Sequence, residues 1–130
     1  MIYLTTEQVL FIHSRVVAET GGTHEVRDLA LLQSALARPQ ATFDGKELYP
    51  DLHSKAAALL DSIVNNHPFM DGNKPTGIVA TGLFLRFNGR RLNSSNLETE
   101  TFALEIATLH PGIAIISSWL ETHTESLKKP

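Results

Sequence analysis

The chain has 130 residues, of which 42% are hydrophobic and 19% charged, with a net charge of −3 and a pI of about 6.0. This length fits a single domain over residues 1–130, and the absence of cysteine excludes disulfides, thiol nucleophiles and Cys-based zinc sites. The acidic balance argues against direct DNA binding, and the lack of a signal peptide or a long apolar run predicts a soluble, cytoplasmic protein outside the membrane.

Two helices are predicted in the first third of the chain. Thr5 and Gln8 have the spacing of a capping box, and the apolar residues after them recur at helical intervals up to the glycine pair at 21–22. A second helix is predicted over 28–39. Residues 39–50 contain two prolines and a glycine, and they are predicted to form a loop with a short extended flap.

A helical hairpin is predicted in the middle of the chain. Asp51 caps a third helix that ends at 65–66, and a fourth helix runs over about 75–87. The fourth helix is apolar nearly all round, so it is predicted to be the buried central helix, packed against the apolar face of the third. That face consists of Leu52, Leu59, Leu60 and Ile63.

The last third of the chain predicts two more helices. Ser95 and Glu98 form a second capping box, which opens a fifth helix. Residues 113–127 predict a sixth helix, although the β-branched start at 113–116 also suits a short strand, for which no pairing partner is evident. The sequence therefore predicts an all-α domain, a compact bundle of about six helices.

The stretch NNHPFMDGNKPTG, residues 65–77, leads into the fourth helix, whose free N–H groups and dipole favour anions. Gly72 permits close backbone approach to a ligand, and Lys74 offers a charge suited to phosphate. Asp71 is an oxygen ligand of the kind that Mg²⁺ uses, and His67 exchanges a proton near pH 7. Together these residues indicate a phosphate cradle beside a base, suited to transferring a phosphoryl or nucleotidyl group to a hydroxyl.

Each of these residues alone has an ordinary explanation. A histidine before a proline is usually a loop residue, and Asp-Gly-Asn is common in turns. The glycine and lysine spacing is not that of a P-loop, and the chain has no His-Glu-x-x-His zinc motif. The combination at the start of an apolar helix is what indicates a functional site.

The stretch HPFMDGNKPTG resembles the motif of the Fic/Doc family, roughly H-x-F-x-[DE]-G-N-[KG]-R-[TS], and its lysine resembles the death-on-curing (Doc) toxin branch. The resemblance extends over 21–60 before the motif and 83–92 after it. It implies a bundle of about six helices that uses ATP and Mg²⁺ to transfer AMP, or in the Doc branch a phosphoryl group, to a hydroxyl of a target protein. It further implies a translation elongation factor as target and, as partner, an antitoxin that folds on binding in the bacterial cytoplasm.

The same resemblance implies roles for individual residues. His67 matches the catalytic base, and Asp71 matches the acidic residue that holds Mg²⁺ or orients the phosphate. Gly72, Asn73 and Lys74 match the anion-binding turn, with Lys74 also counted among the catalytic residues.

Other positions of the motif match supporting parts of such a site. Phe69 matches the aromatic residue that anchors the loop in the core. Thr76 and Gly77 continue the nucleotide-binding segment, and the loop 39–50 matches the place where the family docks its target backbone.

Pro75 departs from the family pattern, which has an arginine that clamps the nucleotide phosphates. An arginine–phosphate contact is worth roughly 1.5–3 kcal/mol, and losing such a charge from a transition state costs about 10²–10³ in rate. Pro75 also lacks an N–H and disfavours helical geometry at Lys74, although the first helical turn tolerates proline. We therefore expect an impaired transferase; the alternatives are a catalytically degenerate module that still binds an antitoxin, and an unrelated helical scaffold.

Overall fold

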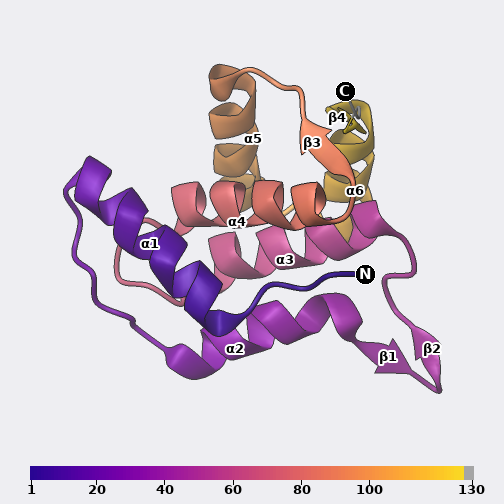
Figure 1. Cartoon of the computed structure of the whole chain (residues 1–130), viewed down its shortest axis with the longest axis horizontal. Helices are drawn as coiled ribbons and strands as arrows, with labels where there is room; N and C mark the ends of the chain where they lie inside the picture. The colour runs from indigo at the N-terminus through magenta and orange to yellow at the C-terminus, as the bar shows by residue number, and fades with distance from the viewer. Residues whose placement is uncertain (128–130) are drawn as a thin grey trace.

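The computed structural model describes residues 1–127 and, within them, contains six α-helices, a 3₁₀ turn and two small antiparallel sheets (Figure 1). The helices are α1 (Thr6–Thr20), α2 (Leu29–Ala37), α3 (Leu52–Asn66), α4 (Asn73–Phe87), α5 (Asn96–Leu109) and α6 (Ile113–Thr122), with the 3₁₀ turn η1 at Arg38–Gln40. The strands are β1 (Thr42–Phe43) paired with β2 (Lys46–Glu47), and β3 (Arg90–Leu92) paired with β4 (Thr124–Ser126). The prediction of an all-α bundle is confirmed, and no helix in the described part of the chain has the length and hydropathy to cross a membrane.

Side-chain caps set the helix starts that the sequence predicts. The Thr5 hydroxyl accepts the Gln8 N–H at 3.2 Å, and Gln8 Oε1 accepts the Thr5 N–H at 2.8 Å. Ser95 and Glu98 make the same reciprocal pair at the start of α5, and Asp51 caps α3. Each cap satisfies N–H groups that have no partner within the helix, which is why the boundaries fall there.

Helix α4 is central to the bundle, as predicted for the fourth helix, but α3 is the more buried of the two. Nine residues of α3 are buried, and the helix packs against α2, α4, α5 and α6, whereas α4 leaves one side exposed, with Val79 at 47% exposure. Three consecutive alanines, 56–58, keep α3 slim enough for neighbours on several sides. In Figure 1, α3 and α4 run side by side through the middle of the molecule.

The predicted packing of α3 on α4 is confirmed. Leu59, Leu60 and Ile63 are buried, and Leu52 is half-buried. Gly77 of α4 lies so close to α3 that a Cβ there would stand 3.3 Å from Leu60 Cδ1, tighter than ordinary contact. The glycine therefore allows the two helices to approach each other.

Three predicted boundaries are wrong. Helix α4 starts at Asn73, two residues before the predicted start at Pro75, and the second helix ends at Ala37 before giving way to η1. Residues 113–116 are helical, and the last helix stops at Thr122. The strand lies instead at β4, which pairs with β3. Strands of three residues are too short to show alternation, and their pairing depends on contacts distant in sequence.

The predicted flap is the β1–β2 hairpin, turned at Asp44 and Gly45, whose φ angles of 53° and 77° suit a two-residue hairpin loop. Lys55 of α3 fixes the base of this hairpin to the helix. The Lys55 Nζ donates to Glu47 Oε1 at 2.8 Å and to the Pro39 carbonyl at 3.0 Å. Lys55 is only 2% exposed. Burial acts to lower the pKa of Lys55, but Glu47 and Tyr3 together outweigh it through hydrogen bonds and charge, so the pKa is raised and the lysine stays charged.

Candidate functional site

The motif loop, residues 67–72, joins α3 to α4 and has left-handed backbone at both ends. His67 caps α3 with φ 51° and ψ 61°, and Gly72 precedes α4 with φ 79°. Non-glycine residues seldom adopt positive φ, so the conformation of His67 requires support from its neighbours. The result is a sharp reversal that presents the His67 side chain to solvent.

Arg27 supplies part of that support. Its Nε donates to the His67 carbonyl at 2.6 Å, and its Nη2 donates to the Asn66 carbonyl at 2.7 Å. Both carbonyls lie at the C-terminus of α3, where helical partners are missing and the dipole favours a cation. Sequence reasoning missed Arg27, since a basic residue 40 positions away carries no local signal of this contact.

The segment 23–28 runs beside the motif loop and bonds to its backbone. The Pro68 carbonyl accepts two N–H groups, from Arg27 at 2.8 Å and from the next residue at 3.0 Å. The Met70 N–H donates to the Glu25 carbonyl at 3.1 Å. The loop is therefore held along its length by the connection between α1 and α2.

The Asn73 side chain is a brace within the loop. Its Oδ1 accepts the Phe69 N–H at 3.0 Å, and its Nδ2 donates to the Phe69 carbonyl at 2.9 Å. Nδ2 also lies 3.4 Å from His67 Nδ1, a contact too long to fix the tautomer of the imidazole. Asn73 is 8% exposed, and its side-chain amide bonds within the protein. Of Asn73, only the backbone N–H, at the start of α4, is left for a ligand.

Phe69 anchors the loop in the core, as the resemblance implies. Its ring is 1% exposed and stacks on His13 of α1, with centroids 3.7 Å apart. His13 Nε2 donates to the Asp71 carbonyl at 2.9 Å, because a carbonyl only accepts. Burial lowers the pKa of His13, although the bond to Asp71 acts in the opposite direction, so the ring is held neutral. The sequence analysis did not single out His13, which lies on the core face of its helix.

Asp71 and Lys74 are exposed at the same end of the α3–α4 hairpin as His67. The Asp71 Oδ2 accepts the Thr23 N–H at 3.0 Å, which leaves Oδ1 without a hydrogen bond within residues 1–127. Gly22 makes this approach possible, because a Cβ there would stand 2.8 Å from Asp71 Cβ. Lys74 is the second residue of α4. The motif loop and the first turn of α4 thus carry an acid, an imidazole and an ammonium group, all exposed.

Thr76 and Gly77 are not brought to that surface. Both are buried, and the Thr76 N–H bonds to the Gly72 carbonyl at 2.9 Å. The Thr76 hydroxyl has no partner in the described part of the chain, and Gly77 faces α3. In this arrangement neither residue offers a side chain to a ligand beside His67.

Pro75 is the third residue of α4 and borders an open cleft of about 530 Å³. The cleft is lined by Glu19, Pro75, Ile78, Val79, Leu92, Ser94, Asn96, Thr99 and Glu100. It therefore combines an apolar floor with two carboxylates, and no lysine or arginine of residues 1–127 lines it. Without an N–H at Pro75, the start of α4 offers fewer donors to an anion.

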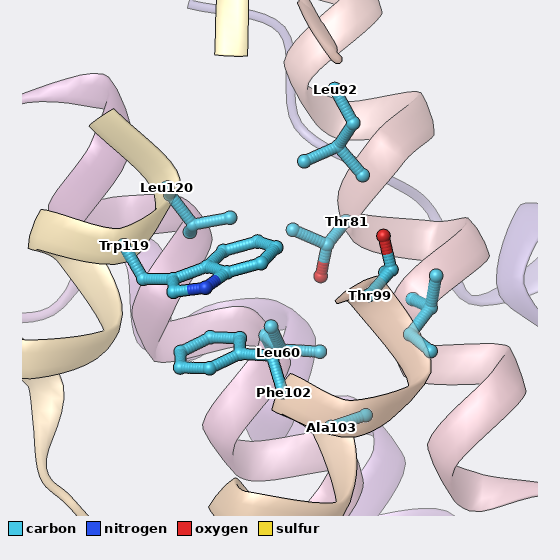
Figure 2. Close-up of a pocket in the computed structure, with 9 residues that line it drawn as sticks. Leu60, Thr81, Leu92, Thr99, Phe102, Ala103, Trp119 and Leu120 are labelled. Atoms are coloured by element: carbon cyan, nitrogen blue, oxygen red, sulfur yellow. The ribbon is translucent and has the colours of Figure 1, made fainter. Parts of the chain in front are cut away.

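A second cavity lies in the core, away from the motif loop. Figure 2 shows its lining, which includes Leu60, Thr81, Phe102 and Trp119 from α3, α4, α5 and α6. Its volume of about 10 Å³ is close to the minimum that one water needs. The Thr81 hydroxyl borders it and has no partner in the described residues. The cavity is a packing defect too small for a nucleotide.

Comparison with known proteins places these features in a family. The sequence matches the model of the Fic/DOC family over residues 3–85, which include the motif loop and the first turns of α4. It is 49% identical over 90 residues to Toxin Doc of Mycolicibacterium smegmatis, covering 69% of this chain and 67% of that protein. It is also 29% identical over 89 residues to Protein kinase doc of Escherichia phage P1, covering 68% of this chain and 70% of that protein.

Proposed function

This chain belongs to the Fic/DOC family, and on that premise we propose that it is a Doc-like toxin that transfers a phosphoryl or AMP group from ATP to a hydroxyl of a target protein. We place it in the bacterial cytoplasm, with an antitoxin as partner and a translation factor as target. The observation that carries the proposal is the exposed side chain of His67, at the start of the loop that leads into α4. Arg27 holds the backbone of His67 in place.

The residues around His67 suit this chemistry. ATP, when bound, would supply the transferred group, with ADP leaving in phosphoryl transfer or pyrophosphate in AMP transfer. The His67 imidazole is exposed and accepts the proton of the target hydroxyl as general base. The free Oδ1 of Asp71 suits Mg²⁺, while Lys74 and the unpaired N–H groups at the start of α4 suit phosphate oxygens. Gly72 leaves the backbone accessible there.

We further propose that Pro75 impairs the reaction. The side chain at this position borders the cleft beside the helix start, where a guanidinium would reach phosphate oxygens as a two-pronged donor. Proline supplies neither that charge nor a backbone N–H. Loss of one preorganised electrostatic contact reduces a rate by about 10²–10³.

A binding module without catalysis is the second candidate, and the composition of the cleft favours it. Glu19 and Glu100 would repel a triphosphate, whereas an antitoxin segment with apolar and basic side chains would complement both the floor and the carboxylates. Such a protein would bind its antitoxin but not ATP.

The experiment compares the parent with Pro75→Arg, each incubated with a cell lysate and ATP labelled at either the α or the γ phosphate. We expect label to reach a lysate protein with Pro75→Arg, the labelled position distinguishing AMP from phosphoryl transfer, and growth arrest when this variant is expressed. His67→Ala in the Pro75→Arg background should abolish transfer and leave the fold intact. If Pro75→Arg folds but neither transfers label nor binds ATP better than the parent, the binding module is the better account.

A further inference from the structure

Three potential metal ligands from distant parts of the chain meet at the end of α3 opposite the motif loop. Asp51 and His53 stand at the start of α3, and Glu121 lies in the last turn of α6. Figure 1 shows α6 and β4 at this end of α3. One ligand atom of each side chain lies within 4.8 Å of the other two. Donors about 2.1 Å from a shared ion stand up to ~4 Å apart, so small side-chain movements close the cluster around one ion.

The His53 ring is oriented by residues outside this cluster. Its Nε2 lies 3.0 Å from the hydroxyl of Thr124, which is only 6% exposed. Arg90 Nη2 donates to the same hydroxyl oxygen at 3.3 Å. Metal-binding histidines commonly use one ring nitrogen for such a bond, which fixes the ring and its tautomer. In the tautomer whose Nε2 donates to the Thr124 hydroxyl, Nδ1 keeps its lone pair for a ligand, and Nδ1 makes no hydrogen bond within residues 1–127.

The two carboxylates lack a positive partner in the described part of the chain. Asp51 uses Oδ1 to accept the Ser54 N–H at 2.8 Å, and neither Asp51 nor Glu121 forms an ion pair within residues 1–127. Two like charges this close repel each other. A bound cation would remove it.

We propose that Asp51, His53 and Glu121 bind a divalent transition metal ion, of which Zn²⁺ is the best fit, with water completing the coordination. One imidazole with two carboxylates suits Zn²⁺, whereas Mg²⁺ and Ca²⁺ favour oxygen ligands alone. Helix α3, 15 residues and about 22 Å long, lies between this site and the motif loop. The ion therefore ties the start of α3 to α6 and takes no part in the chemistry proposed at His67.

The test is a calorimetric titration of the full chain, without an affinity tag and stripped by a chelator, with ZnCl₂ and separately with MgCl₂. We expect one Zn²⁺ per chain and a melting temperature that rises with Zn²⁺ but not with Mg²⁺. His53→Gln and Glu121→Gln should each weaken Zn²⁺ binding at least ~10-fold. His24→Gln and Glu105→Gln are matched controls, an exposed loop histidine and an exposed helical glutamate, and they should bind as the parent does.

Asp71→Asn separates the new site from the motif loop. Zn²⁺ binding that persists in Asp71→Asn but is lost in His53→Gln supports the proposal. Binding that is lost in Asp71→Asn or His24→Gln and retained in His53→Gln overturns it, as does the absence of saturable binding at millimolar Zn²⁺. Circular dichroism of each variant checks that the fold is retained. None of these outcomes depends on transferase activity, so failure here leaves the proposed function untouched.

Discussion

Replacing Asn73 with alanine should destabilise the protein by about 2–4 kcal/mol. The substitution removes both side-chain hydrogen bonds to the Phe69 backbone, at 3.0 and 2.9 Å. Phe69 is 1% exposed, so its N–H and carbonyl are left unsatisfied away from water, at about 1–3 kcal/mol each. The higher helix propensity of alanine offsets less than ~1 kcal/mol of this loss.

Urea unfolding followed by circular dichroism measures the effect. Asn73→Asp should fall between the parent and Asn73→Ala, because the carboxylate still accepts the Phe69 N–H but cannot donate to the Phe69 carbonyl. Asn93→Ala is the control, since Asn93 is exposed and its side chain makes no hydrogen bond within residues 1–127. That variant should stay within about 0.5 kcal/mol of the parent.

A loss in Asn73→Ala no larger than in the Asn93 control would refute the brace. The Phe69 groups would then be satisfied in some other way, and the amide would be free to serve a ligand. Hydrogen exchange gives an independent test, because loss of the Asn73 hydrogen bonds should also speed exchange of the Phe69 N–H.

Three further predictions concern packing and pH. Gly77→Ala should lower the free energy of unfolding by about 1–3 kcal/mol, measured by heat or urea, because the added Cβ would stand 3.2 Å from Val64 Cγ2. Gly82→Ala is the control: its nearest contact would be at 3.8 Å, and the alanine should stabilise the helix by up to ~1 kcal/mol. Equal effects at the two glycines would contradict the close approach of α3 and α4. Leu59→Ala should cost about 2–5 kcal/mol, and a loss below ~0.5 kcal/mol would mean that the hairpin packing is misassigned. Because the pKa of His13 in the folded protein is lowered from 6.5, the unfolded chain binds a proton there more readily. The free energy of unfolding should therefore fall as pH drops through 6.5. Urea unfolding measured across this pH range should show a weaker pH dependence in His13→Gln, and an unchanged dependence would contradict the lowered pKa of His13.

The starts of α1, α3 and α5 were predictable because their signals are local. The capping boxes at Thr5 and Ser95 and the cap at Asp51 each involve residues three apart, so the sequence alone displays them. The pairing of β3 with β4 was not predictable, since it joins residues more than thirty positions apart through strands of three residues. The greater burial of α3 than of α4 likewise depends on how many neighbours surround each helix, which periodicity does not reveal.

In the candidate site too, features with local sequence signals were predicted, and features that depend on distant segments were not. The spacing of His67, Asp71 and Lys74 before an apolar helix indicated a phosphate site, and all three are exposed around the start of α4. The supports supplied by Arg27 and His13 were missed, because each comes from a segment remote in sequence. The inward positions of Thr76 and Gly77 were missed too. Which side a residue of the first turn faces depends on where the helix starts, and Pro75 led to a predicted start two residues after the true one at Asn73.

We expect the bonds between residues 23–28 and the motif loop to form late in folding. They join positions 40 to 48 apart, as at Arg27 and Asp71, whereas the α3–α4 hairpin closes over a six-residue loop. Short loops close at lower entropic cost, so the hairpin can form early, while the left-handed turn at His67 awaits docking of the α1–α2 connection. A chain that has folded only its central hairpin carries every residue of the motif without the geometry that aligns them. The geometry of the motif loop is therefore tied to completion of the N-terminal half of the fold.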